Sequence, residues 1–218
     1  MKRIIFLAVF FGFYNGLHAQ YGRGDYNHIG LSAGINQMSL YTSNFKTSPA
    51  MGWVGGMSVR GNYYNNFAME FGMQFSESKF KVGSFSGSTP QDVEMKIMAV
   101  QVNLLLCYKI AGSNFSLDVG PVLQINSKLK YDAIAQDNIV DGIPGLRIKN
   151  LEKVAPINAN IKAGITGGFE NIRLGLYYQY GLTNFLNNLN KQEEIKAVTS
   201  EKLKGNLGII SGHIVVYL

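Results

Sequence analysis

Histidine is the residue type that general bases and metal sites most often use, and this chain contains 3. His18 lies in the N-terminal segment, whereas His28 and His213 lie near opposite ends of the remaining sequence. If the first and last elements of the fold pair, these two could approach each other. Two histidines without a nearby cysteine or acid cluster nevertheless make a weak metal signal. We expect ordinary positions in the wall of the fold for both, and neither a metal ion nor a cofactor.

Aspartates supply a second possible metal chemistry, because their oxygen atoms are ligands that Ca²⁺ prefers. Asp132, Asp137 and Asp141 occur within ten residues of each other, and Gly142 follows the last. Their spacing does not match the EF-hand pattern, and Asp-Gly is a common turn sequence. We therefore interpret these aspartates as loop residues, with no calcium site.

Charged residues also occur singly between apolar neighbours in several segments. Four of them are Arg60, Glu70, Asp118 and Arg173. Gln74, Gln124 and Gln179 occupy similar positions in the same pattern. If all seven face the same enclosed interior, they could form a proton or small-solute path. Buried charges are costly unless they are paired and hydrogen-bonded, so we expect these residues to neutralise and cross-link one another instead.

The elements that position these residues come after an export signal. Lys2 and Arg3 precede an apolar stretch at residues 4–13, and Ala19 supplies the small residue that signal peptidase requires. About ten apolar residues are too few for a transmembrane helix, which needs roughly 20. We therefore predict a signal peptide at residues 1–19 and one domain at residues 20–218. No cysteine lies near the cleavage site to carry a lipid anchor.

Composition limits what the exported domain can be. Charged residues make up 16% of the chain, against roughly 25% in an ordinary soluble domain. The Lys and Arg residues are scattered among acids, which excludes a nucleic-acid partner and favours mild attraction to outer-membrane lipid. The single Cys107 excludes an intramolecular disulfide framework. No mature segment approaches 18 consecutive apolar residues, so any membrane crossing must use strands.

A period of two residues marks the clearest segments. Residues 67–76 place Phe67, Met69, Phe71, Met73 and Phe75 on one face and polar or small residues on the other. Residues 115–126 and 172–180 repeat this alternation, and weaker strands are predicted at 28–38, 50–60, 93–108, 157–169 and 203–218. The fourth of these eight strands shifts its apolar phase between Ile97 and Val100, which predicts a β-bulge.

The connections alternate between short turns and longer polar loops. Short turns are predicted at 61–66, 110–114 and 170–171, and long loops at 39–49, 81–92, 131–156 and 181–202, the last with a short helix at 191–198. An even number of strands with this alternation is typical of outer-membrane barrels, with turns in the periplasm and loops outside. The fold class that we predict is all-β: an eight-stranded antiparallel up-and-down transmembrane β-barrel.

Alternation alone does not say which face points outward. A soluble lipocalin-like barrel that binds a small apolar ligand shows the same period with its apolar face inside. Three features favour the membrane orientation: Phe and Met on the apolar faces, Gly and single charges on the polar faces, and aromatic residues near strand ends. The aromatic residues at strand ends are Trp53, Tyr63, Tyr64, Tyr108, Tyr131, Tyr180 and Tyr217.

Several of these segments resemble a known family. Residues 102–109 (VNLLLCYK), 117–124 (LDVGPVLQ), 164–170 (GITGGFE) and 177–185 (YYQYGLTNF) are similar, in order and spacing, to those of PorT-type outer-membrane β-barrels of Gram-negative bacteria. The chain departs from the family pattern at Asn103, where a proline is common, and at its end, where Leu218 follows Tyr217. The resemblance implies a barrel in the outer membrane. The founding member of the family is linked to protein secretion, and most of its relatives have no assigned role.

Function is expected to lie in the loops and not in a catalytic centre. Enzymes on small barrels usually need a histidine as general base, and none of the four predicted loops contains one. We therefore expect no enzyme and no catalytic residues. The favoured interpretation is a non-enzymatic outer-membrane scaffold whose extracellular loops bind other molecules. The alternative is a subunit or assembly factor of an envelope machine such as a protein secretion apparatus, with envelope or secretion-system proteins as partners.

Overall fold

A computed structural model describes residues 28–111, 114–169 and 171–218 of the chain. The predicted signal peptide at residues 1–19 lies outside the described residues. Eight long strands form the body of the molecule: β1 (His28–Tyr41), β2 (Thr47–Tyr64), β3 (Phe67–Ser86), β4 (Thr89–Ala111), β5 (Phe115–Asn126), β7 (Ile157–Gly168), β8 (Ile172–Gly181) and β9 (Asn206–Tyr217). These confirm all eight predicted strands.

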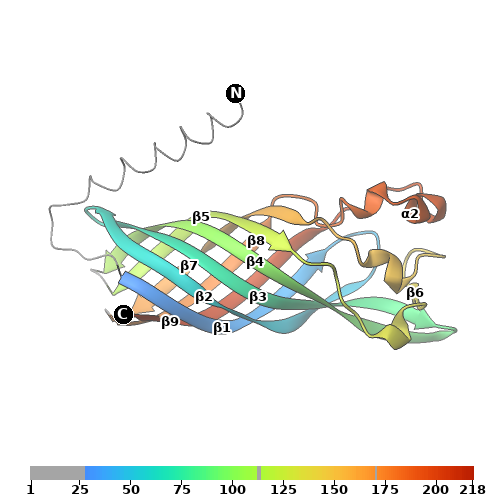
Figure 1. The fold of residues 1–218 in the computed structure, drawn as a ribbon, viewed down its shortest axis with the longest axis horizontal. Helices are drawn as coiled ribbons and strands as arrows, with labels where there is room; N and C mark the ends of the chain where they lie inside the picture. The colour runs from blue at the N-terminus through green and yellow to red at the C-terminus, as the bar shows by residue number, and fades with distance from the viewer. Residues whose placement is uncertain (1–27, 112–113, 170) are drawn as a thin grey trace, which may run out of the picture.

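The strands close into an antiparallel up-and-down barrel. Each pairs with its neighbours in chain order, and the pairing of β1 with β9 completes the circle. Following paired residues once around the wall from Met38 leads back to β1 at His28, ten residues away. An offset of this kind requires the strands to tilt relative to the barrel axis. The tilt is visible in Figure 1.

The two ends of the barrel differ. At one end, the turn end, lie the start of β1, the end of β9 and the hairpin turns between β2 and β3, β4 and β5, and β7 and β8. The opposite end, the loop end, carries the other connections, with β6 (Ile139–Val140), the 3₁₀ turns η1 (Ala133–Ala135), η2 (Ile148–Leu151) and η3 (Leu189–Lys191), and helix α2 (Glu193–Val198). Figure 1 shows the C-terminus at the turn end and β6 and α2 at the loop end. No helix in the described ranges is both long enough and apolar enough to span a membrane.

The wall has an apolar outside and a polar inside. Phe71, Met73 and Phe75 are 50%, 45% and 53% exposed, whereas Glu70 and Gln74, which alternate with them, are buried. Between the turn end and the level of Glu77, no outward position on the described strands carries a charge. This apolar belt is the face that a membrane barrel presents to lipid. A lipocalin-like barrel would have the reverse orientation.

The apolar face reverses where β3 and β4 continue beyond the belt. Toward the loop end Phe80 and Val82 point inward and are fully buried, whereas Lys81 points outward. On β4, Val93, Met95 and Ile97 are likewise buried inside. The register between β3 and β4 is continuous over this whole length. The predicted β-bulge between Ile97 and Val100 is therefore wrong: the apolar residues change sides while the pleat continues unchanged.

Two of the four predicted long loops are also wrong. Residues 81–92 form a continuous β3–β4 hairpin with a two-residue turn at Gly87 and Ser88, where Gly87 has a φ of 62°. Residues 39–49 contain only a short connection, because β1 extends to Tyr41 and β2 begins at Thr47. The predicted strands were too short because, toward the loop end, the apolar residues move from the outward face of each strand to its inward face. The long connections that remain follow β5 and β8.

Candidate functional site

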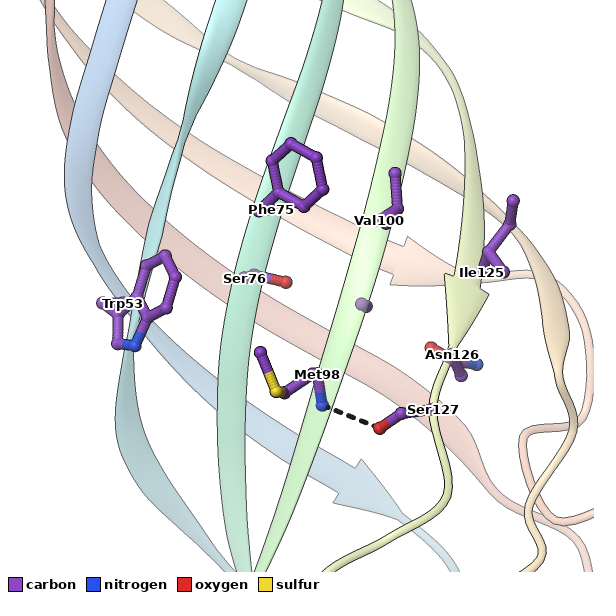
Figure 2. Close-up of a pocket in the computed structure, with 9 residues that line it drawn as sticks. Trp53, Phe75, Ser76, Met98, Val100, Ile125, Asn126 and Ser127 are labelled. Atoms are coloured by element: carbon purple, nitrogen blue, oxygen red, sulfur yellow. Dashed lines mark hydrogen bonds between the residues drawn. The ribbon is translucent and has the colours of Figure 1, made fainter.

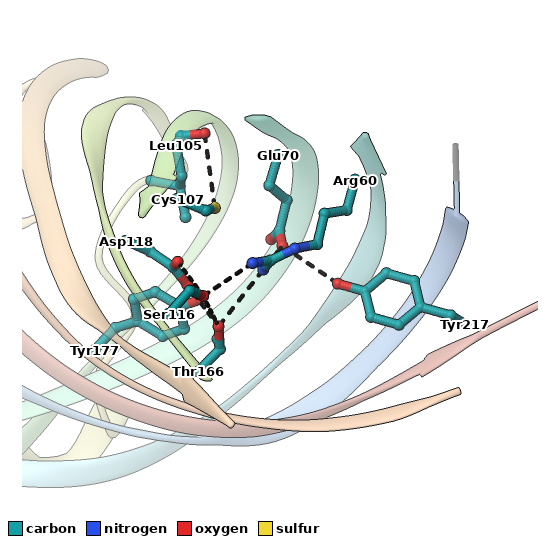
Figure 3. A network of polar contacts seen from close by, with 9 residues as sticks. All are labelled: Arg60, Glu70, Leu105, Cys107, Ser116, Asp118, Thr166, Tyr177 and Tyr217. Atoms are coloured by element: carbon teal, nitrogen blue, oxygen red, sulfur yellow. Dashed lines mark hydrogen bonds and ion pairs between the residues drawn. The ribbon is translucent and has the colours of Figure 1, made fainter. Parts of the chain in front are cut away.

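All seven residues predicted to face the interior are buried in the barrel lumen: Arg60, Glu70, Gln74, Asp118, Gln124, Arg173 and Gln179. They form part of a layered polar network that begins at the turn end (Figure 3). Arg60 on β2 forms an ion pair of 3.5 Å with Glu70 on β3. The Tyr217 hydroxyl donates to the same Glu70 carboxylate oxygen at 3.3 Å, and an Arg60 guanidinium nitrogen donates to Ser116 Oγ at 2.9 Å.

Asp118 on β5 is the acceptor that connects three strands. Its carboxylate accepts hydrogen bonds from Ser116 Oγ at 2.8 Å, Thr166 Oγ1 at 3.0 Å and the Tyr177 hydroxyl at 2.8 Å. These donors come from β5, β7 and β8. Hydrogen bonds to a charged acceptor are about twice as strong as neutral ones. The carboxylate thus holds one side of the barrel together, as the predicted cross-linking requires.

Lys162 is a lumen residue that the sequence interpretation missed. It lies on β7, is 3% exposed, and donates from Nζ to Gln74 Oε1 on β3 at 3.2 Å. Its ammonium group also lies 4.4 Å from the centroid of the Tyr177 ring, a cation–π distance. The regular alternation of Asn158, Asn160 and Lys162 with apolar neighbours could have revealed it.

A layer of amides closes the lumen above Lys162. Gln124 Oε1 accepts hydrogen bonds from Gln101 at 3.4 Å, Asn160 at 3.1 Å and Gln179 at 3.0 Å. Gln124 donates in turn to Asn126 at 2.8 Å. Because an eight-stranded barrel is only just wide enough for its own side chains, these layers fill the lumen. Their chemistry is that of a cross-linked polar interior.

The two histidines do not approach each other. His213 lies opposite Gly34 on β1, whereas His28 lies opposite Arg60 on β2, near the turn end. Six residues of β1 separate these levels, about 20 Å along a strand. His213 instead stacks on the ring of Tyr177 at 5.1 Å between centroids, and His28 contacts the ring of Tyr217. The described ranges contain no cluster of three metal-ligating side chains.

An apolar core caps the polar lumen at the loop end. Its members come from the inward faces of the extended strands, from the two long connections and, in the case of Phe45, from the short connection between β1 and β2. We refer to the following buried residues as the cap core: Met38, Leu40, Phe45, Phe80, Val82, Val93, Met95, Ile97, Leu129, Ala135, Val140, Ile143, Leu146, Ile148, Leu151, Val154, Phe185, Leu186, Leu189, Ile195, Leu203, Leu207 and Ile209. The two long connections are therefore packed and not free loops.

Polar side chains hold the connections in place around the cap core. Asn138 donates to Ser84 Oγ at 3.4 Å and to Gln91 at 3.2 Å, which joins the connection after β5 to the β3–β4 hairpin. Asn184 accepts from the backbone N–H of Gly205 at 2.8 Å and donates to the Leu203 carbonyl at 3.0 Å. The predicted helix at 191–198 appears as η3 and α2, and its Ile195 packs into the cap core.

The three loop aspartates have separate roles. Asp132 caps η1 by accepting from the backbone N–H of Ile134 at 3.1 Å. Asp137 forms ion pairs with Arg147 at 2.8 Å and Lys149 at 2.9 Å, and these hydrogen bonds lower the pKa of its carboxyl. Asp141 joins the connection to β3 through its backbone, which accepts from Lys46 and donates to Gly83. Asp132 and Asp137 thus stabilise the connection through their carboxylates, and Asp141 does so through its backbone.

Comparison with solved structures places this architecture among small outer-membrane barrels. The neisserial surface protein A (NspA) is similar with a TM-score of 0.50 at 12% identity, over 87% of this chain and 97% of that one. The attachment invasion locus protein Ail of Yersinia pestis, in complex with the heparin analogue sucrose octasulfate, has a TM-score of 0.47 at 13% identity, over 88% and 99%. The outer membrane protein OprG of Pseudomonas aeruginosa has a TM-score of 0.39 at 9% identity, over 88% and 94%. No family model and no curated sequence matches the chain. The similarity to NspA shows the fold, an eight-stranded outer-membrane-type barrel.

Proposed function

We propose that this chain is a non-enzymatic integral protein of the outer membrane whose sealed barrel holds the loop-end cap at the cell surface for binding. The cap core carries this proposal. Its residues convert the extended strands and both long connections into one packed unit, continuous with the barrel wall. Binding residues are commonly placed on connections that a rigid scaffold positions.

The lumen supports a scaffold more than a channel or an enzyme. Arg60 pairs with Glu70 and donates to Ser116, which in turn donates to Asp118. In the next layer Gln124 accepts hydrogen bonds from neighbouring amides. His213 packs against a tyrosine ring, and its Nδ1 has no hydrogen-bond partner in the part of the chain that the structure describes. A buried histidine stacked in this way is poorly placed to act as a general base.

The location and orientation can be tested with single cysteines. Cys107 is buried, so a cysteine introduced at Ser88, on the exposed tip of the β3–β4 hairpin, would be the accessible thiol of the described chain. Intact cells expressing the Ser88→Cys variant should react with a membrane-impermeant maleimide. The matched variant Asn66→Cys, in the exposed β2–β3 turn, should react only after the outer membrane is permeabilised. The opposite pattern would reverse the orientation.

The membrane assignment and the predicted signal peptide have their own measurements. The protein should sediment with membranes on ultracentrifugation of a lysate without detergent, and its measured mass should correspond to cleavage after Ala19. Protein that remains in the supernatant would exclude the membrane assignment. An uncleaved N-terminus would exclude the signal peptide and leave the barrel unaffected.

The envelope-machine alternative is supported by the PorT-type resemblance and by one surface feature. Tyr63, Tyr64 and Phe169 at the turn end are 70%, 67% and 77% exposed, more than the residues of the belt. Aromatic residues of this kind commonly line the membrane interface, and they also form contacts with other proteins. Purification in mild detergent separates the two functions: stoichiometric co-purifying subunits favour the machine, and a lone barrel favours the scaffold.

A further inference from the structure

The β3–β4 hairpin has an edge along β4 that no other strand of the described chain covers. β4 begins at Thr89, but its pairing with β5 begins only at Ala99, opposite Asn126. Figure 2 shows the end of β5 at this level, with β4 continuing beside β3. Ser127 Oγ extends the contact by one residue, because it accepts from the backbone N–H of Met98 at 3.1 Å (Figure 2). Most of β4 before Ala99 therefore has a strand on its β3 side alone.

The last contact on this edge joins Lys96 to Lys130. The backbone N–H of each residue donates to the carbonyl of the other at 2.8 Å, so the backbone groups of Lys96 point off the edge, away from β3. Because alternate residues of a strand direct their backbone groups to the same side, those of Glu94 and Asp92 also point off the edge. Within the part of the chain that the structure describes, neither residue uses these groups in a hydrogen bond. Such groups are a template for a further strand.

The opposite edge of the hairpin is covered. β3 pairs with β2 as far as Val82, opposite Thr47, and β6 then pairs with Ser84 and Phe85. Proteins usually cover, shorten or charge the edges of their sheets, because an open edge pairs with other chains. Here the fold covers the β3 edge along its length and leaves the β4 edge accessible, with Asp92 exposed on it.

Charge disfavours a second copy of this chain as the occupant of the edge. Two copies that pair antiparallel and hydrogen-bond through Asp92 and Glu94 place carboxylates opposite each other, and like charges in that position are destabilising. Glu94 already has two cations, Lys79 at 3.4 Å and Lys96 at 3.5 Å. Asp92 forms no ion pair with a described residue, and Gly83 lies opposite it on β3. The edge therefore favours a strand that places a cation opposite Asp92.

The inward side of the edge is apolar. Val93 and Met95 alternate with the two acidic residues, point into the cap core and are 3% and 0% exposed. Side chains of an added strand alternate in the same way, so the residues on either side of its basic residue would lie beside Val93 and Met95. Apolar residues suit those positions.

On the basis of the cell-surface location proposed above, we propose that the β4 edge binds an extended segment of another protein by strand addition. In this segment a lysine or arginine alternates with apolar residues. The basic residue lies opposite Asp92, the main chain pairs with Asp92 and Glu94, and an apolar neighbour lies beside Val93. In strand addition the main-chain hydrogen bonds supply affinity, and alternate side chains supply selectivity.

A short synthetic peptide tests the pairing. The probe is fluorescently labelled TVTVKVT with blocked ends, titrated against the barrel in mild detergent and followed by fluorescence anisotropy. One peptide should bind per barrel, and TVTVEVT should bind more weakly. Methylation of the backbone nitrogens of the lysine and the central threonine should abolish binding, because these N–H groups face β4 when the lysine pairs with Asp92. Methylation of the two valines that flank the lysine should leave binding intact, because their N–H groups face away.

Variants of the barrel separate the backbone from the charge. Asp92→Pro keeps the ladder with β3, since this N–H points off the edge, and should weaken binding about tenfold or more. Asp92→Asn removes only the charge and should weaken binding about two- to fivefold. The control Glu201→Gln removes an exposed carboxylate from the connection after β8 and should bind like the parent. Amide exchange measured by NMR should slow at Asp92 and Glu94 when the peptide is added.

Each alternative result has a defined meaning. Absence of saturable binding, equal binding of the peptide methylated on lysine and threonine, or protection of other amides only would overturn strand addition at this edge. Equal binding of the glutamate peptide would overturn the role of Asp92. A dimer in detergent that Asp92→Pro converts to a monomer would identify a second copy as the occupant instead. A barrel that binds the peptide but is not labelled at Ser88→Cys on intact cells overturns the proposed function and not the edge site, whereas a labelled barrel without binding overturns this inference alone.

Discussion

The ring of Phe80 meets the ring of Phe185 edge to face, with centroids 6.5 Å apart and an interplanar angle of 81°. Phe80 points inward from β3, and Phe185 lies in the connection that follows β8. Their contact therefore joins elements that are not neighbours in the barrel wall. It couples the β3–β4 hairpin to the chain above the opposite wall, at the base of the cap core.

Replacement of Phe80 by Ala should loosen the cap without opening the barrel. Removal of a fully buried phenyl ring typically costs about 3–5 kcal/mol, and here the loss falls on the cap core. Limited proteolysis of the variant should cleave the two long connections faster, while the barrel keeps its heat-modifiable migration in gels. The exposed neighbour Lys81→Ala serves as control and should leave proteolysis unchanged. Loss of the folded barrel band in Phe80→Ala would mean that the cap and the barrel fold as one unit.

Replacement of Phe71 by Arg should destabilise the barrel by about 2–4 kcal/mol in lipid vesicles, because Phe71 is an outward residue inside the apolar belt. Urea titration followed by tryptophan fluorescence measures the free energy of unfolding, since the chain contains 1 Trp. The control Phe71→Leu keeps the position apolar and should cost much less. Similar costs for both variants would contradict the assignment of this face to lipid.

The Arg60–Glu70 pair should show strong coupling in a double-mutant cycle. Loss of one partner leaves the other charge buried, which costs about 3–5 kcal/mol. The double variant Arg60→Met/Glu70→Leu should be close to the parent in unfolding free energy, because no charge of the pair remains. Additive losses in the same urea titration would show that the two side chains act independently.

The barrel should not conduct ions in planar bilayers. The polar layers around Asp118 and Gln124 fill the lumen below the cap core, so deletion of residues 130–153 should also leave the bilayer closed. A stable open-channel current from the deletion variant would identify the cap as the barrier. A current from the parent protein would contradict a sealed lumen altogether.

Acid should release the connection after β5 through Asp137. Its folded-state pKa is lowered by the hydrogen bonds from Lys149 and Arg147, so its stabilising effect is present above the ordinary pKa of an aspartate. The effect is lost as pH falls through the lowered pKa. Proteolysis of this connection by an acid-tolerant protease should therefore accelerate below about pH 4 in the parent. In Asp137→Asn the rate of proteolysis should not change across that pH range, because the titrating carboxyl is absent. Asp92→Asn, a change at an exposed residue of the hairpin, should behave like the parent.

The membrane part of the fold could be predicted well from sequence because its pattern is local. Residues 115–126 were predicted as a strand with the bounds that the structure shows, and Phe71 and Glu70 were assigned to the correct faces. Period-two alternation reports directly which side chains share an environment. The inward position of Arg60, Asp118 and Arg173 followed from the same pattern.

The loop end could not be predicted because its environment differs from that of the belt. At Phe80 and Ile97 the inward side becomes apolar. The alternation of apolar residues therefore predicted a bulge or a loop where the strand in fact continues. The prediction that His28 and His213 could approach each other was wrong for another reason. The path of paired residues around the wall returns to β1 ten residues away, at His28 when it starts from Met38. This offset is a property of the closed barrel and cannot be seen in any short stretch of sequence.

The length of the β3–β4 hairpin has a practical consequence for display. From Glu77 at the margin of the belt, β3 continues for nine residues to Ser86, about 30 Å along the strand. A lipid head-group layer is only about 5–8 Å thick, so the turn at Gly87 stands well clear of it. A Cβ at Gly87 would meet nothing within 4 Å. In the proposed orientation, a peptide inserted at this turn would project into the medium from a hairpin whose β3 edge is paired with β2 and β6. The barrel would then carry foreign epitopes on living cells.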